Sequence, residues 1–255
     1  MTRTRVIPLL LIEKGKLVKT VQFKKAKYVG DPINAVKIFN EKEIDEIIIL
    51  DITATVEKRA PDIQMITDLA GECFMPFCYG GGITTIEDMK RIFYAGSEKI
   101  CINTAAVQNP ALISEAARLF GNQSIVVSID VKKNIWGKYQ VFTQRGTKNT
   151  GIDPIRFAVE MESSGAGEIF LNSIEKDGTF SGYDLELTEQ VSNAIKIPVI
   201  AGGGAGKVED LADAVRFGAS AVAAGSMFVF QGTHRAVLIN FPSQEVLKEK
   251  LYSIS

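Results

Sequence analysis

The sequence predicts a closed (β/α)8 barrel, in which eight parallel strands alternate with helices and two half-barrel repeats form the ring. Two observations support this prediction: an internal repeat with a constant offset, and eight short apolar runs separated by amphipathic segments. The 255 residues also match the roughly 250 that such a barrel needs. We expect one domain over residues 1–255, with half-barrels at about 1–122 and 123–255. An open, doubly wound sheet is the alternative, but it gives no reason for an even repeat of four units.

The repeat is visible without any gap. The stretch from residue 74, FMPFCYGGGITTIEDMKRIFYAGSEKICINT, matches the stretch from residue 196, KIPVIAGGGAGKVEDLADAVRFGASAVAAGS, in its proline, three glycines and the Glu and Asp that follow. The offset of 122 residues also relates Asp31 to Asp153 and Glu46 to Glu168. A register that persists over most of both halves indicates duplication.

Each half contains four apolar runs and the helical segments between them. The expected strands are RVIPLLL, EIIILDI, MPFCYG and EKICIN in the first half, and SIVVSID, EIFLNSI, IPVIAG and SAVAAGS in the second. Such continuous apolar runs are typical of strands buried on both faces of a parallel sheet. The segments DPINAVKIFNEK, TIEDMKRIFYAG, NPALISEAARLFG and KVEDLADAVRFG are amphipathic at helical spacing, and Asp, Thr or Asn residues begin several of them as expected N-caps.

Composition excludes several kinds of partner. With 46% apolar residues, 23% charged residues and a net charge of −1, the chain belongs to the ordinary globular class and lacks the overall positive field that attracts nucleic acid or anionic membranes. The apolar run near the N-terminus is too short for a membrane span and lacks a signal-peptide cleavage site, so we expect a buried strand and a cytoplasmic protein. Cys73, Cys78, Cys101 and the single His234 show no metal-binding or disulfide spacing, and we expect neither a metal nor a cofactor.

Two glycine triplets, at residues 80–82 and 202–204, each follow an expected strand and precede a helix. Glycine allows a backbone to approach a ligand closely, and amide groups at a helix start attract oxyanions. Small polar pairs follow one strand later in both halves. We therefore predict two phosphate-binding cradles and a substrate with a phosphate at each end; two tight turns without a ligand are the alternative. The cradle residues are Gly81, Gly82, Asn103 and Thr104 in the first half, and Gly203, Gly204, Gly225 and Ser226 in the second.

Asp130 ends the strand SIVVSID, where a barrel enzyme carries its chemistry, and it is our candidate for general acid or base work. A cap for the following loop is the alternative. The spacing to the next Asp-Pro pair places Leu11 opposite Asp130, and leucine cannot transfer a proton. Lys19 is a candidate anion contact in a long Lys-rich loop, while Asp177 and Gly178 end the sixth strand and are expected to line the same opening.

The motifs LDITA, YGGGI, INTAAV, SIDVK, FTQRGTKNTG, GAGEI, DGTFSGYDLEL and IPVIAGGGAG occur in this order over essentially the whole chain. Together they resemble the HisF family, the cyclase subunit of imidazole glycerol phosphate synthase. This resemblance implies a barrel that receives ammonia from a HisH glutaminase and a doubly phosphorylated substrate that fits the cradles above. It also implies a charged ring that gates ammonia entry at the opposite end, formed here by Arg5, Glu46, Lys99 and Glu168. A purely structural cluster of salt bridges is the alternative for these four residues.

Two departures from the family pattern change the expected function. Leu11 stands where the family has its first catalytic Asp, and Gly202 stands where it has a Ser. HisF-like proteins with such changes are associated with amidation of acetamido sugars for surface polysaccharides, so we expect a HisH-like glutaminase and a separate sugar amidotransferase as partners. The alternatives are a genuine cyclase of histidine biosynthesis, a non-catalytic scaffold that activates a glutaminase, and a HisA-like sugar-phosphate isomerase.

Overall fold

Eight parallel strands close into a barrel in the computed structural model, which describes residues 3–232 and 234–253. Each strand pairs with its neighbours in parallel, and β12 pairs with β1 to complete the ring. The predicted (β/α)8 barrel is therefore confirmed. The ring runs in the order β1 (Arg5–Glu13), β4 (Ile47–Asp51), β5 (Phe77–Gly80), β6 (Lys99–Ile102), β7 (Ile125–Lys133), β10 (Glu168–Ser173), β11 (Val199–Gly202) and β12 (Ala221–Ala224).

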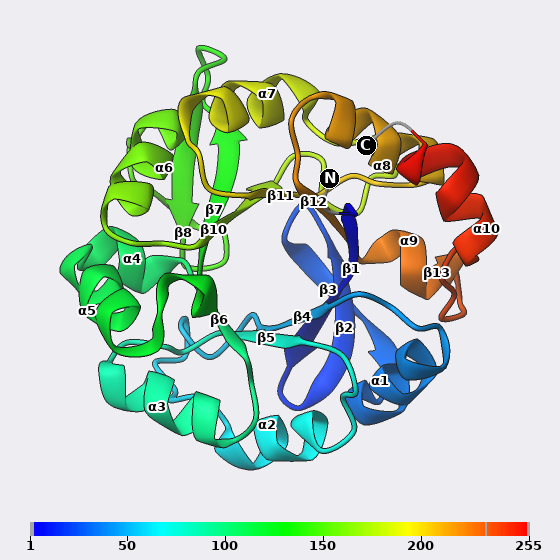
Figure 1. The fold of residues 1–255 in the computed structure, drawn as a ribbon, viewed down its shortest axis with the longest axis horizontal. Coiled ribbons are helices and arrows are strands. Elements are labelled where there is room, and N and C mark those ends of the chain that lie inside the picture. Colours follow the sequence, from blue (N-terminus) through cyan, green and yellow to red (C-terminus); the bar gives the residue numbers. More distant parts are fainter. Residues whose placement is uncertain (1–2, 233, 254–255) are drawn as a thin grey trace.

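Helices surround the strands on the outside (Figure 1). The longer ones are α1 (Pro32–Glu41), α2 (Ile63–Ala70), α3 (Ile86–Tyr94), α5 (Ala111–Phe120), α6 (Pro154–Ser163), α7 (Leu185–Ala194) and α8 (Val208–Arg216). Short helices are α4 (Thr104–Gln108), α9 (Ser226–Val229), α10 (Gln244–Leu247), the 3₁₀ turn η1 (Asn122–Ser124) and the π-helical turn η2 (Lys248–Tyr252). In the described part of the chain no helix is long and apolar enough to cross a membrane.

Helix starts follow the predicted capping in both halves, with one exception. Asp31 accepts a hydrogen bond from Asn34 N at 2.9 Å, and Asp153, its equivalent, accepts from two backbone amides at 3.0 Å. Thr85 and Asp88 form a capping box at α3. The expected Asn cap of α5 is wrong, because Pro110 holds that position and makes no side-chain cap.

Two apolar cores lie on the two faces of the barrel wall. The outer core fills the space between strands and helices, and the inner core fills the barrel itself. Phe170 is the only aromatic side chain in the inner core of described residues, and aliphatic and cysteine side chains accompany it. The inner core consists of Ile7, Leu9, Leu11, Val18, Ile48, Cys78, Cys101, Val126, Phe170, Ile200, Ala221 and Ala223.

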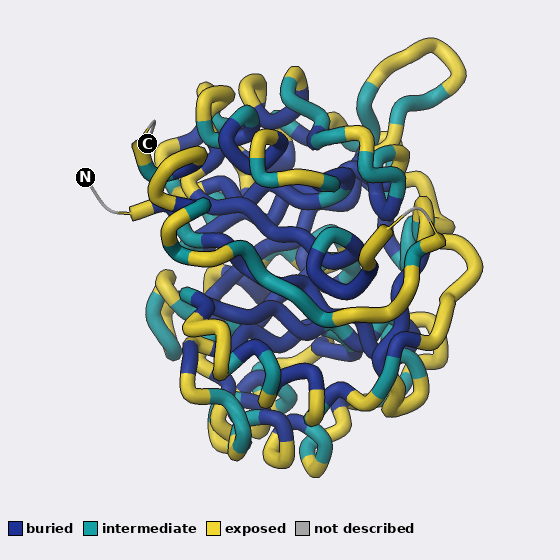
Figure 2. The backbone as a smooth tube through the Cα atoms, turned by 90° about the vertical axis from the view of Figure 1, so that its right-hand side faces the viewer, coloured by how far each residue is buried: buried dark blue, intermediate teal, exposed yellow. Residues whose placement is uncertain are grey.

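The segments after β1 and β7 form antiparallel extensions where the sequence predicts long loops. The first contains β2 (Lys16–Val21) and β3 (Lys24–Gly30), and the second contains β8 (Tyr139–Thr143) and β9 (Lys148–Asn149). A small hairpin, β13 (Phe230–Gln231) and β14 (Ala236–Val237), follows α9. Buried segments lie in the middle of the molecule in Figure 2, and one exposed loop projects beyond the rest. Its place in Figure 1 identifies it as the tip between β7 and β8, where Ile135 and Trp136 are 89% and 77% exposed.

Candidate functional site at the mouth of the barrel

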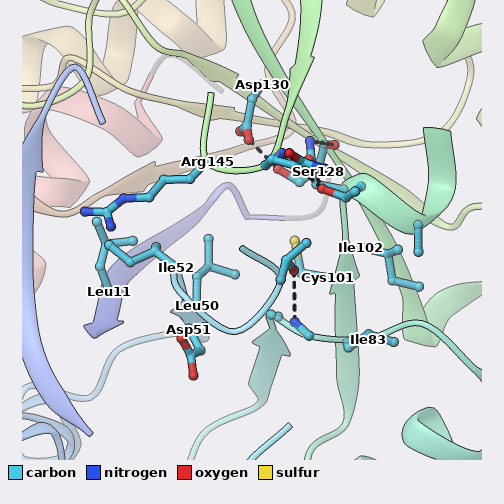
Figure 3. Close-up of a pocket in the computed structure, with 18 of the residues that line it drawn as sticks. Leu11, Leu50, Asp51, Ile52, Ile83, Cys101, Ile102, Ser128, Asp130 and Arg145 are labelled. Atoms are coloured by element: carbon cyan, nitrogen blue, oxygen red, sulfur yellow. Dashed lines mark hydrogen bonds between the residues drawn. The ribbon is translucent and has the colours of Figure 1, made fainter. Parts of the chain in front are cut away.

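A cavity of about 580 Å³ opens at the carboxyl ends of the strands, the end that we call the mouth (Figure 3). This volume lies within the range of small-molecule sites. The first glycine loop, Asn103, Thr104, Asp130 and Asp177 all line it. The structure therefore brings together, around one cavity, predicted residues that lie far apart in the sequence.

The first cradle (residues 80–82 with Asn103 and Thr104) has the backbone geometry that only glycine tolerates. Gly81 and Gly82 have φ angles of +118° and +72°, and a Cβ on Gly81 would lie 2.3 Å from the carbonyl oxygen of Asp51. Thr104 begins α4 directly after β6 and donates to Asn103 Oδ1 at 3.2 Å. This cradle opens onto the cavity.

The second cradle (residues 202–204 with Gly225 and Ser226) has similar glycine geometry but little room. Gly203 and Gly204 have φ angles of +85° and +114°. The space beside them, which Gly225 and Ser226 also line, measures only about 10 Å³. Lys19 Nζ lies 2.0 Å from the position of a Cβ on Gly225, so the ammonium group packs directly against this glycine. The two cradles therefore share a backbone design and differ in free volume.

Lys19 is buried at 3% exposure. Burial lowers the pKa of its ammonium group, and the nearby carboxylate of Asp177 partly offsets this effect. Lys19 lies beside the glycine-rich turn of the second cradle, and its role as an anion contact stays a prediction.

Asp177 and Gly178 hold the β2–β3 hairpin over the mouth. Thr20 Oγ1 donates to Asp177 Oδ2 at 3.0 Å, and the amide of Gln22 donates to the Asp177 carbonyl at 2.9 Å. Gly178, at a φ of +70°, lies so close to the hairpin that a Cβ would meet the Thr20 carbonyl oxygen at 2.5 Å. Asp177 and Gly178 therefore anchor the β2–β3 hairpin at the mouth.

Asp130 is the buried carboxylate of the mouth, at 8% exposure. Ser128 Oγ donates to its Oδ1 at 3.3 Å, and Asn172 Nδ2 lies 3.5 Å from the same atom. Burial raises the pKa of Asp130 to about 7, although these two hydrogen bonds act in the opposite direction. A carboxyl group that titrates near neutral pH is suited to proton transfer.

The wall opposite Asp130 is apolar. In the closed ring β1 and β7 are four strands apart in either direction, so Leu11 and Asp130 face each other across the mouth. Leu9, Leu11, Leu50 and Ile52 line the cavity on that side. Among the described residues that line the cavity, none from β1 is a carboxylate; Glu13, the last residue of β1, pairs with Arg145.

A closed ring of four charges lies at the other end of the barrel. Lys99 Nζ contacts Glu46 Oε1 at 3.0 Å and Glu168 Oε1 at 3.1 Å, and Arg5 completes the ring by contacting both glutamates, 3.1 Å from Glu168. Burial lowers the pKa of the Arg5 guanidinium group, but the negative charges of Glu168 and Glu46 outweigh this effect, so the pKa is raised overall. The side chains are 3% to 26% exposed. The four predicted residues therefore form one ring.

The sequence did not indicate several polar residues of the mouth, among them Ser128, Asn172 and Arg145, which all line the cavity. Ser128 and Asn172 point inward on the strands that carry Asp130 and Glu168, so the strand alternation was a usable signal for both. Arg145 follows β8 in an irregular turn, and nothing in the local pattern indicated its direction. Within the described ranges, no group of three or more His, Cys, Asp and Glu side chains is arranged to hold a metal ion, and the three cysteines are free.

A (β/α)8 barrel with polar side chains gathered around a cavity at the carboxyl ends of its strands belongs to the class of barrel proteins whose ligand site lies at that end. Comparison with known sequences gives the family. The model of the histidine biosynthesis protein family matches residues 5–235, and the chain belongs to this family.

The curated relatives agree along nearly the whole chain. A Pseudomonas aeruginosa protein provisionally named imidazole glycerol phosphate synthase subunit hisF2 is 54% identical over 243 residues, covering 95% of this chain and 97% of the relative. A Vibrio vulnificus protein, provisionally named subunit hisF3, is 49% identical and covers 98% and 97%. The imidazole glycerol phosphate synthase subunit HisF of Sulfurisphaera tokodaii is 48% identical and covers 88% and 90%. The chain is thus a homologue of the HisF cyclase subunit.

Proposed function

We propose that this chain is the ammonia-receiving subunit of a glutamine amidotransferase complex, in which a HisH-like glutaminase docks at the charged ring. The ammonia then serves a separate amidotransferase that amidates an acetamido sugar for a surface polysaccharide. The mouth binds a phosphorylated small molecule through the cradles. The observation that supports this proposal most directly is the complete ring of Arg5, Glu46, Lys99 and Glu168 at one end of a closed barrel.

The ring and the barrel interior fit the passage of a small neutral amine. Glu168 Oε2 is buried and has no hydrogen-bond partner among the described residues, so it is available to accept an N–H. Above the ring the inner core is lined by aliphatic, cysteine and phenylalanine side chains. Such surroundings favour uncharged NH3 over NH4⁺, because burial of an unpaired charge is costly.

The residues of the mouth favour a role in ammonia transfer over one in cyclisation. Asp130 is present and titrates in a useful range, but Leu11 occupies the opposing position and cannot act as an acid or base. Loss of one acid or base group generally costs on the order of 10² to 10⁴ in rate. We expect the barrel to retain ligand binding and to have weak or absent cyclase activity.

A glutamine hydrolysis assay tests whether a HisH-like glutaminase is the partner. We expect the purified chain to stimulate a HisH-like glutaminase, and we expect Lys99→Ala to lose most of that stimulation because it opens the ring. Lys90→Ala is the matched control, since Lys90 is an exposed lysine that pairs with Glu87 on the same helix. Equal stimulation by the wild type and by Lys99→Ala would refute a role of the ring, and no stimulation by either would refute the partner.

A genuine cyclase of histidine biosynthesis is the second candidate, and the intact first cradle and Asp130 favour it. Turnover of the ribulosyl-formimino substrate with ammonium salt separates the two. We expect little turnover by the wild type and a gain in Leu11→Asp, whereas wild-type turnover equal to that of a histidine-pathway HisF would favour the cyclase. A scaffold that only activates a glutaminase predicts stimulation without transfer of ammonia to any acceptor.

A further inference from the structure

Arg145 occupies an unusual turn between β8 and β9. Gln144, Arg145 and Gly146 are three consecutive residues with φ angles of +53°, +58° and +71°. Residues other than glycine rarely adopt positive φ angles, and they keep them only where neighbouring groups hold the backbone in place. Here the amide of Gln144 donates to Thr104 Oγ1 at 3.1 Å, and Thr147 Oγ1 donates to the Gln144 carbonyl at 2.7 Å. The turn is therefore tied to a residue of the first cradle.

The guanidinium group of Arg145 lines the mouth cavity and is only partly engaged. Its Nη1 donates to Glu13 Oε1 at 3.1 Å, and the two side chains are 22% and 26% exposed. Its Nε is buried and has no hydrogen-bond partner among the described residues. A guanidinium group has five N–H donors, so most of its capacity remains available.

Arg145 changes the charge of the wall that faces Asp130. Figure 3 shows its side chain extending toward the end of β1, where Leu11 lies, and the contact with Glu13 fixes it there. A guanidinium group stays protonated and cannot exchange a proton, but its paired N–H groups match the oxygens of a carboxylate or phosphate. The wall is therefore suited to an anion and unsuited to acid–base work.

We propose that Arg145 is an anion-binding, specificity-determining residue of the mouth, which takes a carboxylate or phosphate group of the bound ligand. The same cavity contains the first cradle, so the ligand carries one anionic group at that cradle and another at Arg145. This binding role does not depend on ammonia delivery and goes beyond the function proposed above.

Anion titrations on the full chain test this role. Inorganic phosphate and malonate, as a phosphate and a carboxylate probe, are titrated by calorimetry into the wild type, Arg145→Ala, Glu13→Gln and Arg156→Ala. We expect Arg145→Ala to weaken binding of at least one probe about tenfold or more, because charge-assisted bonds are lost. Glu13→Gln should tighten it, because the competing carboxylate is gone. Arg156→Ala is the control, since Arg156 is exposed on α6.

The contrast between the two partners of the ion pair separates binding from a structural role. If Arg145 and Glu13 only brace the hairpins, both substitutions lower stability alike and neither changes anion affinity, which would overturn the proposal. Absence of wild-type binding to both probes would also overturn it. Arg145→Lys keeps the positive charge at this position. It also assigns the Nε–H signal of Arg145 in NMR spectra, because that signal is missing from the spectrum of the variant. That signal should shift when the better-bound probe is added, and a signal that stays fixed contradicts the proposal. Glutaminase stimulation should stay unchanged in the control Arg156→Ala.

Discussion

Replacement of Asp130 by Asn should make the protein more stable at neutral and alkaline pH. Burial raises the pKa of this carboxyl from 3.8 to about 7, so the folded state resists its ionisation. Below about pH 3 both folded and unfolded states hold the proton, and the site costs nothing. Above about pH 8 both states have released it, and the folded state bears the full cost of a buried anion. Wild-type stability should therefore fall as the pH rises through this window.

The size of the effect follows from the shift. Three pKa units correspond to about 4 kcal/mol at 1.36 kcal/mol per unit. Between pH 5 and pH 8 the free energy of unfolding of Asp130→Asn should gain about 2 to 3 kcal/mol relative to the wild type. Asn preserves the shape of the side chain and its ability to accept from Ser128, so little else changes.

Urea denaturation of both proteins at intervals between pH 5 and pH 8 measures this difference. Asp213→Asn is a suitable control, because Asp213 is a half-exposed carboxylate paired with Arg216 on the same helix. If the curves of Asp130→Asn and the wild type stay parallel over this range, Asp130 is already ionised at pH 5 and the argument from burial is wrong.

Three further substitutions test the packing. Gly202→Ser places a Cβ 2.5 Å from the Phe170 ring, and urea denaturation should show a loss of about 1 to 3 kcal/mol in the free energy of unfolding. A second substitution in the same chain, Phe170→Leu, should recover much of that loss. An unchanged stability of Gly202→Ser would contradict the contact. Asp177→Ala removes the carboxylate that accepts from Thr20 and from the Phe23 amide, so hydrogen exchange of that amide should become about ten times faster. Unchanged exchange would show that the backbone contacts alone hold the hairpin. Asp153→Ala removes the cap of α6 and should cost about 1 kcal/mol in urea without changing anion binding; a change in affinity would mean that the helix start acts on the mouth.

The barrel and the pairing of Glu46 with Glu168 were predictable because their signals are local or repeated, whereas Arg5 and Lys99 were assigned to the ring only through the resemblance to the HisF family. Apolar runs marked the strands, Asp31 and Asp153 marked matching helix starts, and the constant offset linked Glu46 to Glu168. Each of these signals follows from alternation, capping or duplication, which a single sequence records directly.

The contacts of the hairpins at the mouth and the position of Arg145 there were not predictable in this way. Thr20 meets Asp177 across 157 residues, and Arg145 meets Glu13 across 132. The segment around β2 and β3 is rich in lysine and has no strong apolar alternation, so it resembled an open loop. The free volumes of the two cradles also differ although their glycines match, because Lys19 enters the second one from another strand. Contacts of this kind depend on the assembled fold.

The strand β10 carries inward-facing side chains at three levels: Glu168 in the charged ring, Phe170 in the inner core and Asn172 beside Asp130. At about 3.3 Å per residue these levels span roughly 13 Å. Hydrogen bonds to β7 and β11 hold the strand along its length. One continuous hydrogen-bonded strand therefore joins the charged ring, the inner core and the mouth, so a shift of its register would displace side chains at all three levels.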